Sequence, residues 1–318
     1  MRSRRGAALS LGALVALAAC ASPPEPDPRY RPAESLLEVV AVLRRHVPDD
    51  TYRFEPARDF TGRNVYRASL LRLENLERAY EGAYRAGYMD DVLAFAKGRA
   101  LERLRAYDLA AARYVVAAEG DAELRTEALR SSALCLRLHG AVHGEPVHGE
   151  PESRGDPLPG DDPELALLER RRGQLEALLA DAAGSHYEAV VHEELEHVDV
   201  ERARTIAGRR HAGADGDVRA VAAWQQVVLE HRDSKNANRH LLELADLYAE
   251  LAEGYVARHP PESLGFDPPT FEELATSATR LYEAVANQDG ATERIEAARR
   301  LEAFLAFTLR IDRDRFSR

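Results

Sequence analysis

Six residues near the middle of the chain form the most metal-like pattern in the sequence, His192-Glu-Glu-Leu-Glu-His197. One helical turn would pair His192 with Glu196 and Glu193 with His197, and Glu194-x-x-His197 matches half of the ligand set of a carboxylate di-iron bundle. The second helix-borne Glu-x-x-His that such a bundle requires is absent, and histidines five residues apart lie on different faces of a helix. We therefore predict a solvated, charged helix face here. The alternative is a helical-bundle metal-binding protein or enzyme whose ligands are His192, Glu193, Glu196 and His197.

Other residues with potential chemistry are isolated. Three histidines, His139, His143 and His148, lie in or beside a segment rich in glycine and proline, which fixes no ligand geometry. Cys135 stands among alanine and leucine on a predicted helix, which is typical of a buried structural cysteine. We therefore predict no catalytic residues, no cofactor and no metal.

The loop expected from Val47 to Arg63 contains the densest mixture of aromatic and basic side chains in the protein. These side chains are Tyr52, Arg53, Phe54, Arg58, Phe60 and Arg63. Such residues are common binding anchors, but a long loop must also bury side chains to hold itself against its neighbours. We expect this loop to pack on itself and its surroundings, and a binding surface is the alternative.

The elements that position these residues are predicted to be helices throughout. No stretch alternates apolar and polar residues for long enough to demand a strand, so we predict an all-α fold of about ten or eleven helices. The first helix is expected from about Ala33 to His46. Capping signals predict further helix starts at Asn64, at Asp162-Pro163, and at the capping boxes Ser185-x-x-Glu188 and Thr270-x-x-Glu273.

Three helical segments follow one another from Val92 to Leu138 with almost no connecting chain. Asp90-Asp91 offers an N-cap to the first segment, and Gly120 offers a C-cap before the third. Small residues let antiparallel helices approach closely, and aromatic residues fill the gap between one hairpin and the next. Such residues recur here at three- and four-residue steps after Gly98, as Tyr107, Ala110, Tyr114 and Ala117. The pattern resembles a tetratricopeptide (TPR) unit.

The same resemblance returns in the second half of the chain. Ala220-x-x-x-Trp224-x-x-Val227, an Asp233-Ser234 turn and Leu244-Ala245-x-x-Tyr248 are similar to the end of one TPR unit passing into the next. The turn resembles the one between units in envelope lipoproteins that act as assembly scaffolds. The resemblance implies antiparallel hairpins stacked as an α-solenoid, whose surface binds peptides or partner proteins.

The chain starts with a basic leader, a mostly apolar run from Gly6 to Leu17, and the sequence Leu17-Ala-Ala-Cys20. These parts resemble a bacterial lipoprotein signal with its lipobox. The apolar run is shorter than the roughly 20 residues that a membrane-spanning helix needs. The resemblance implies cleavage after Ala19, lipid attachment at Cys20 and, because Ala21 follows, an address at the periplasmic face of the outer membrane.

Two stretches of unusual composition divide the rest of the chain. A proline-rich stretch follows Cys20, and a later stretch repeats Val-His-Gly-Glu-Pro in tandem between Val142 and Pro151, as length-tolerant linkers do. The expected segments are a signal peptide (1–19), the lipidated cysteine with a proline-rich tether (20–32), an N-terminal TPR-like block (33–139), a flexible linker (140–162), a C-terminal TPR-like block (163–312) and a tail (313–318).

The charge of the chain restricts its partners. Removal of the three leader arginines with the signal peptide would change the net charge from −11 to −14. Such an acidic body is a poor binder of nucleic acid. We predict a lipid-anchored scaffold of the cell envelope that binds a partner protein or peptide and catalyses no reaction. Besides the metal-binding alternative, a cell-wall glycan-binding helical domain is a third possibility.

Overall fold

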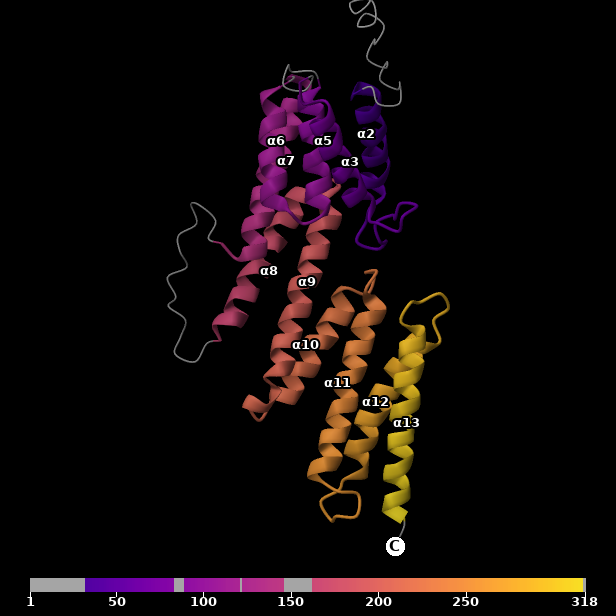
Figure 1. Ribbon diagram of the computed structural model, residues 1–318. Coiled ribbons are helices and arrows are strands. Elements are labelled where there is room, and N and C mark those ends of the chain that lie inside the picture. The colour runs from indigo at the N-terminus through magenta and orange to yellow at the C-terminus, as the bar shows by residue number, and fades with distance from the viewer. Residues whose placement is uncertain (1–31, 83–88, 121, 146–161, 317–318) are drawn as a thin grey trace, which may run out of the picture.

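The computed structural model describes residues 32–82, 89–120, 122–145 and 162–316, and most of these residues are helical (Figure 1). The only β pairing among the described residues is an isolated antiparallel bridge between Arg58 and Asn64. The all-α prediction is confirmed. The described α-helices are α2 (Pro32–Asp49), α3 (Val65–Ala79), α5 (Asp90–Arg103), α6 (Tyr107–Glu119), α7 (Ala122–His143), α8 (Pro163–Ala182), α9 (Tyr187–Gly208), α10 (Gly216–Glu230), α11 (Ala237–Arg258), α12 (Pro268–Ala286) and α13 (Arg294–Phe316), with a 3-10 helix, η2 (Arg210–Ala212), before α10.

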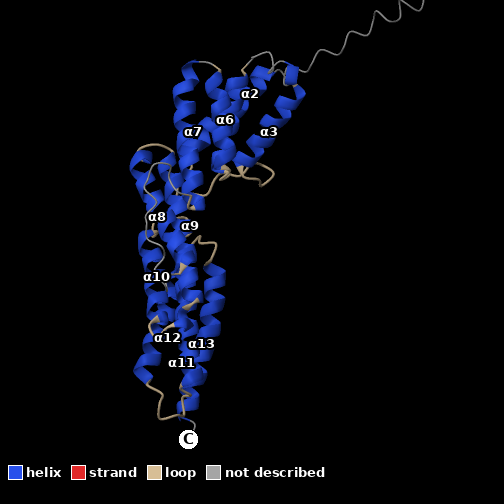
Figure 2. Ribbon diagram, turned by 90° about the vertical axis from the view of Figure 1, so that its left-hand side faces the viewer, coloured by secondary structure: helices blue, strands red, loops and turns tan. Residues whose placement is uncertain are grey.

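Consecutive helices lie side by side and build an elongated stack (Figures 1 and 2). Helices α2, α3, α5, α6 and α7 form one end, α8 and α9 the middle, and α10 to α13 the other end. Each helix buries its apolar face against the helices next to it in the stack, as in a solenoid. The predicted α-solenoid is confirmed.

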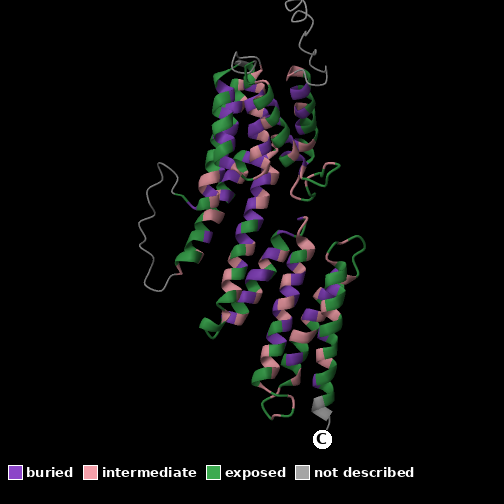
Figure 3. Ribbon diagram, in the orientation of Figure 1, coloured by how far each residue is buried: buried purple, intermediate pink, exposed green. Residues whose placement is uncertain are grey.

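Several apolar clusters follow one another along the stack in place of one central core. Buried residues accordingly lie along one side of most helices over the whole length of the stack (Figure 3). The cluster around α5 to α9 contains Cys135 on α7, Leu175 on α8 and Val191 on α9. The two sides of the predicted linker therefore share one apolar core.

Side-chain caps set several helix starts, and not all of them are the predicted ones. Asn64 and Asp162 accept backbone N–H groups from the first turns of α3 and α8, as predicted. The capping box expected at Thr270 is wrong, because α12 already begins at Pro268 and Asp267 accepts the Thr270 N–H. Prolines fit the first turn of a helix, so the two that follow Asp267 start α12 earlier than the box predicts.

Some helix ends also differ from the predicted ones. Helix α2 covers Pro32–Asp49 rather than 33–46, and α13 runs to Phe316, beyond the end predicted at 312. Helix α7 continues to His143, so residues 140–143 of the predicted linker are helical. The N-cap residue of helix α5 is Met89, which has a left-handed backbone (φ 58°). The predicted N-cap at Asp90-Asp91 is therefore wrong.

The signal peptide, Cys20, the proline-rich tether and residues 146–161 of the linker lie outside the described ranges. Within those ranges, no helix combines the length and the apolar character needed to cross a membrane. The described part of the chain is thus the helical body between residues 32 and 316, without residues 83–88, 121 and 146–161.

Helices α5, α6 and α7 pack through the small and aromatic residues that the sequence singled out. Tyr107, Ala110, Tyr114 and Ala117 are at most 3% exposed, as predicted for core contacts. A Cβ added to Gly98 would lie 2.6 Å from a carbon of the Tyr114 ring, so a larger residue would displace the ring. The phenol groups of both tyrosines also donate hydrogen bonds to buried carboxylates.

Candidate functional site

Helix α9 carries the metal-like pattern, and its side chains contact helices and loops from both ends of the stack. The prediction of a solvated face is wrong for the carboxylates, because Glu194 is only 1% exposed and Glu196 only 3%. Asp199, one turn further, is 5% exposed. A buried carboxylate is tolerated only when other groups supply positive charge or hydrogen bonds. The partners of these three acids define the candidate site, which we call the α9 junction.

Glu194 is bound from the side of α5 and α6. Arg105, in the connection between those helices, donates Nε to Oε1 (2.7 Å) and Nη2 to Oε2 (2.8 Å). The Tyr107 hydroxyl donates to Oε1 at 2.7 Å. Arg105 has a left-handed backbone (φ 63°), which is uncommon for a residue with a side chain and occurs here at the point where the chain turns into α6.

Glu196 is bound from the opposite side, by the turn between α10 and α11. Ser234 Oγ donates to Oε1 at 2.6 Å, Asn236 Nδ2 donates at 3.2 Å, and His240 Nε2 lies 2.6 Å from the same oxygen. Burial alone would raise the pKa of Glu196, but the hydrogen bonds from His240 and Ser234 outweigh burial and lower it. The side chain is therefore a fixed anion at neutral pH.

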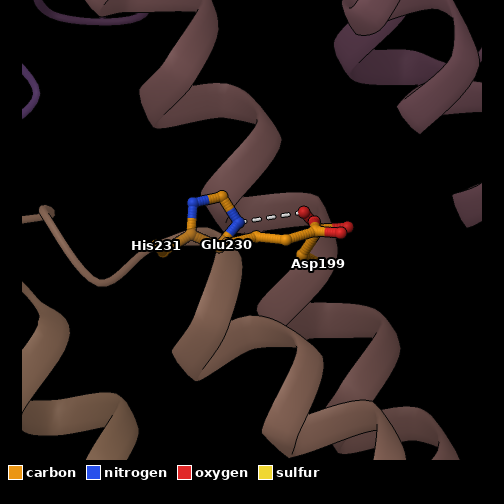
Figure 4. Close-up of side chains that lie close together, drawn as sticks. All are labelled: Asp199, Glu230 and His231. Carbon is orange, nitrogen blue, oxygen red and sulfur yellow. Dashed lines mark hydrogen bonds and ion pairs between the residues drawn. The ribbon is translucent and has the colours of Figure 1, made fainter.

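Asp199 forms a third cluster with residues of α8 and α10 (Figure 4). Its ligand atoms, together with those of Glu230 and His231, lie within 4.8 Å of one another, which is compatible with a metal site. However, Arg172 donates Nε to Asp199 (2.8 Å) and Nη2 to Glu230 (3.0 Å), and His231 Nε2 lies 2.9 Å from Asp199. Because Arg172 already supplies the positive charge, these residues fit an ion-pair cluster better than a metal centre.

The four residues of the alternative metal site do not converge on one point. Glu193 pairs with Lys235 and lies 3.8 Å from Arg103, while Glu196 faces the turn before α11. His192 stacks against Tyr52, with ring centroids 5.3 Å apart. His197 is half-exposed beside Glu194.

Burial lowers the pKa of both His192 and His197, so that both rings are neutral at neutral pH. As predicted from their five-residue spacing, the two histidines point to different neighbours.

A second buried carboxylate, Glu102 on α5, lies between α6 and the start of α9. It accepts hydrogen bonds from the hydroxyls of Tyr114 (2.6 Å) and Tyr187 (2.7 Å), and His186 Nε2 lies 2.6 Å from it. Burial raises the pKa of Glu102, but the hydrogen bond from His186 and the charge of Arg99 outweigh burial and lower it to about 2.

Cys135 lies next to this cluster and is fully buried. Burial raises the pKa of its thiol, so the thiol is protonated at neutral pH and is a poor nucleophile. The prediction of a buried structural cysteine is confirmed.

The aromatic and basic loop after α2 reaches the α9 junction at one point. The Tyr52 hydroxyl lies 2.6 Å from His231 Nδ1, and the backbone N–H of Lys235 donates to the Tyr52 carbonyl at 3.3 Å. Self-packing is thus confirmed for Tyr52. It is wrong for Phe54 and Phe60, which are 67% and 102% exposed. Beside the junction, a polar hollow of about 190 Å³ is lined by Glu55, Pro56, Arg58, Asn64 and Lys235.

Comparison with known proteins does not extend this description. No family model, no curated protein and no solved structure matches the chain. The residues of the junction must therefore be interpreted from their own geometry.

Sequence reasoning missed most partners of the buried acids, among them Arg105, Arg172, His231, His240 and Lys235. One signal was present in the composition, because the chain has only two lysines, Lys97 and Lys235, among 43 basic residues. Lys97 is 2% exposed and pairs with Glu77, and Lys235 pairs with Glu193. In a chain that otherwise uses arginine, both lysines pair with glutamates in largely buried surroundings.

Proposed function

We propose that this protein is a lipid-anchored scaffold of the bacterial cell envelope that binds a partner protein or peptide on its TPR-like helical surface and catalyses no reaction. The observation that carries the proposal is an apolar outer face on the hairpin of α6 and α7. Its large exposed side chains are Leu109, Val115, Val116, Leu129 and Leu136, each 45–57% exposed.

Contacts between α6 and α7 support the view that these side chains belong to one surface. Arg125 Nε donates to the carbonyl of Ala118, and Ser132 Oγ donates to the carbonyl of Ala111, so the two helices run antiparallel in a defined register. This register places Val115 and Leu129 at about the same level along the two helices, and both side chains are exposed. Exposed apolar patches of this kind are typical of protein-binding surfaces.

The α9 junction contributes rigidity to this scaffold. Its buried acids are each bound by cations, hydroxyls or histidines, so they hold helices in place rather than wait for a ligand. A rigid scaffold loses little conformational entropy when a partner docks. The junction therefore supports a binding role for the helical surface and a structural role for α9.

Cross-linking in the native host, followed by mass spectrometry, tests the partner-binding part of the proposal. We expect a partner cross-linked to the α6–α7 face, and we expect its recovery to fall when Leu129 and Leu136 are both replaced by serine. The matched control replaces Val218 and Leu229 on α10, which are 72% and 70% exposed, by serine. Equal recovery with both double variants would contradict the assignment of the surface.

Membrane fractionation tests the anchor independently. The lipobox resemblance predicts that Cys20→Ser releases the protein from the membrane fraction or leaves it unprocessed. Cys135→Ser is the matched control, because Cys135 is buried in the helical core and should not carry lipid. A Cys20→Ser protein that is still cleaved after Ala19 and still partitions into detergent would refute the anchor.

A further inference from the structure

The loop of residues 51–63, which we call the Phe loop, displays two phenylalanines to solvent. Phe54 is 67% exposed and Phe60 is 102% exposed. Among the other residues of known exposure in the described ranges, every large exposed apolar side chain is leucine, isoleucine or valine. Two exposed aromatic residues in one loop are a concentration of apolar surface that a soluble protein rarely leaves without a use.

The tip of the Phe loop is held in one conformation by Asp59. The Asp59 carboxylate accepts hydrogen bonds from the Thr61 backbone N–H (2.9 Å), the Thr61 hydroxyl (2.6 Å) and the Arg63 N–H (3.0 Å). Gly62 closes the turn with its N–H on the Asp59 carbonyl (2.9 Å) and a φ of +77°, which favours glycine. Phe60 is therefore presented at the tip of an ordered turn, and its docking costs little loop entropy.

The exposed charge of the Phe loop differs in sign from the charge of the chain. Arg53, Arg58 and Arg63 are exposed, and the exposed acid among them is Glu55. The Asp59 carboxylate is bound within the turn by neutral donors and keeps its charge, so residues 51–63 carry three arginines and two acids, a net charge of +1. Arg53 also lies 3.6 Å from Asp233, which leaves Arg58 and Arg63 as the arginines of the loop that form no ion pair with a carboxylate of the described residues. A chain with a net charge of −11 thus carries a locally basic loop that also carries two phenylalanines. Arginine beside exposed aromatic residues is the combination that binds the interface of an anionic lipid bilayer.

The position of the Phe loop allows it to reach the bilayer that would hold the Cys20 lipid. Helix α2 has 18 residues, so the loop at its end lies about 27 Å from Pro32 along the helix axis. Cys20 precedes Pro32 by 12 residues, and an extended chain of that length spans roughly 40 Å. The tether is therefore long enough for anchor and loop to contact the same membrane. Both views show the loop projecting from the side of the stack (Figures 1 and 2).

We propose that the Phe loop is a second membrane contact, in which Phe54 and Phe60 enter the interfacial region of an anionic bilayer and the neighbouring arginines bind lipid phosphates. The inference rests on the proposed function for the lipid anchor that brings a bilayer within reach. A membrane fits the loop better than a protein partner does, because the hollow beside it is small and polar and offers no apolar groove. Once docked, the loop would fix the orientation of the helical stack relative to the membrane surface.

Vesicle sedimentation tests the contact without the lipid anchor. The probe is the mature chain from residue 20 with Cys20→Ser, which retains every described residue. We expect it to sediment with vesicles that contain about one third phosphatidylglycerol, to remain in solution with phosphatidylcholine alone, and to be released by added salt. Absence of binding to the anionic vesicles would overturn the proposal.

Single substitutions in the same probe locate the contact. Phe60→Ser should weaken vesicle binding roughly fivefold, because part of an aromatic side chain no longer leaves water. Arg63→Ala should weaken it about fivefold at low salt. The matched control is Leu264→Ser in the loop before α12, since Leu264 is also fully exposed (109%). All three variants should keep the wild-type melting temperature, and equal vesicle binding by all three would overturn the proposal.

Two further outcomes separate this inference from the proposed function. Loss of vesicle binding in Phe60→Ser supports the membrane contact even if Cys20 carries no lipid, in which case only the proposed anchor fails. Conversely, if Cys20 is lipidated but Phe60→Ser abolishes a protein cross-link and leaves vesicle binding unchanged, the Phe loop binds a protein and the membrane contact is refuted.

Discussion

Helices α5, α6 and α7 pack mainly through glycine, alanine and tyrosine, whereas α9 adds three buried carboxylates to its apolar contacts with neighbouring helices. In the first region the packing residues lie only three or four positions apart in the sequence, as Ala110 and Tyr114 do on α6. In the second region the partners come from far away in the sequence. Arg105 lies 89 residues from Glu194, and His240 lies 44 residues from Glu196. The difference shows that apolar packing is encoded locally, while the burial of a charge is decided by the fold as a whole.

Tyr114 belongs to both kinds of contact, and replacing it should have the largest effect. Tyr114→Ala removes a buried ring and the donor to Glu102, and should lower the free energy of unfolding by about 3–5 kcal/mol. Tyr114→Phe keeps the ring and removes only the hydroxyl, at a cost of about 1 kcal/mol. Chemical denaturation measures both values. Equal losses in the two variants would mean that the hydrogen bond, and not the packing, dominates at this position.

Glu102 should make stability depend on acid pH. Its pKa in the folded protein is lowered to about 2, with burial opposed and outweighed by His186 and Arg99. The carboxylate therefore stabilises the fold above its ordinary pKa near 4.5, and this contribution is lost as the pH falls from about 4.5 to about 2. The contribution at neutral pH is on the order of 3 kcal/mol.

Melting temperatures between pH 7 and pH 2 measure this contribution. Glu102→Gln should melt below the wild type at pH 7, and the difference should shrink as the pH falls. A constant difference at every pH would contradict the assigned ionisation of Glu102.

Ala110 tests the apolar region alone. Ala110→Leu should overpack the crossing of α5 and α6 and lower the free energy of unfolding by about 1–3 kcal/mol. Ala112→Leu is the matched control on the same helix, because Ala112 is exposed and its replacement should change stability by less than about 0.5 kcal/mol. Thermal melting of both variants, followed by circular dichroism, makes the comparison. Similar melting temperatures would show that α6 is not tightly packed at Ala110.

Ser234 tests the polar region with the smallest expected effect. Ser234→Ala removes one donor from Glu196 and the acceptor of the Asn236 backbone N–H, but leaves the Asn236 and His240 side chains in place, so we expect a loss of about 1 kcal/mol. Thr292→Ala, at an exposed position, should leave stability unchanged. Chemical denaturation again gives both values. No loss in Ser234→Ala would show that the remaining donors of the α9 junction fully compensate for the missing one.

The sequence was sufficient for the helices and for part of their packing. Helical periodicity and capping residues such as Asn64 and Asp162 act over a few residues, and they correctly predicted an all-α stack. The small and aromatic spacing correctly predicted the burial of Tyr107, Ala110, Tyr114 and Ala117. The burial of Glu194 and Glu196 could not be predicted in this way. A run of acids and histidines on a helix is usually solvated, and only the fold brings Arg105 and His240 to it.

The contact between Tyr52 and His231 also affects which parts of the protein can unfold independently. In a linear array each unit touches only its neighbours, so an end can unravel while the rest remains folded. Here the chain closes on itself across 179 residues, between the loop after α2 and the end of α10. Loss of α10 would therefore also release the loop after α2, while α2 itself stays packed on α3 and α5. Removal of the first helices would expose the turn before α11. Truncation from either end should be tolerated only outside this closed span, which leaves α12 and α13 as the part that can fray independently.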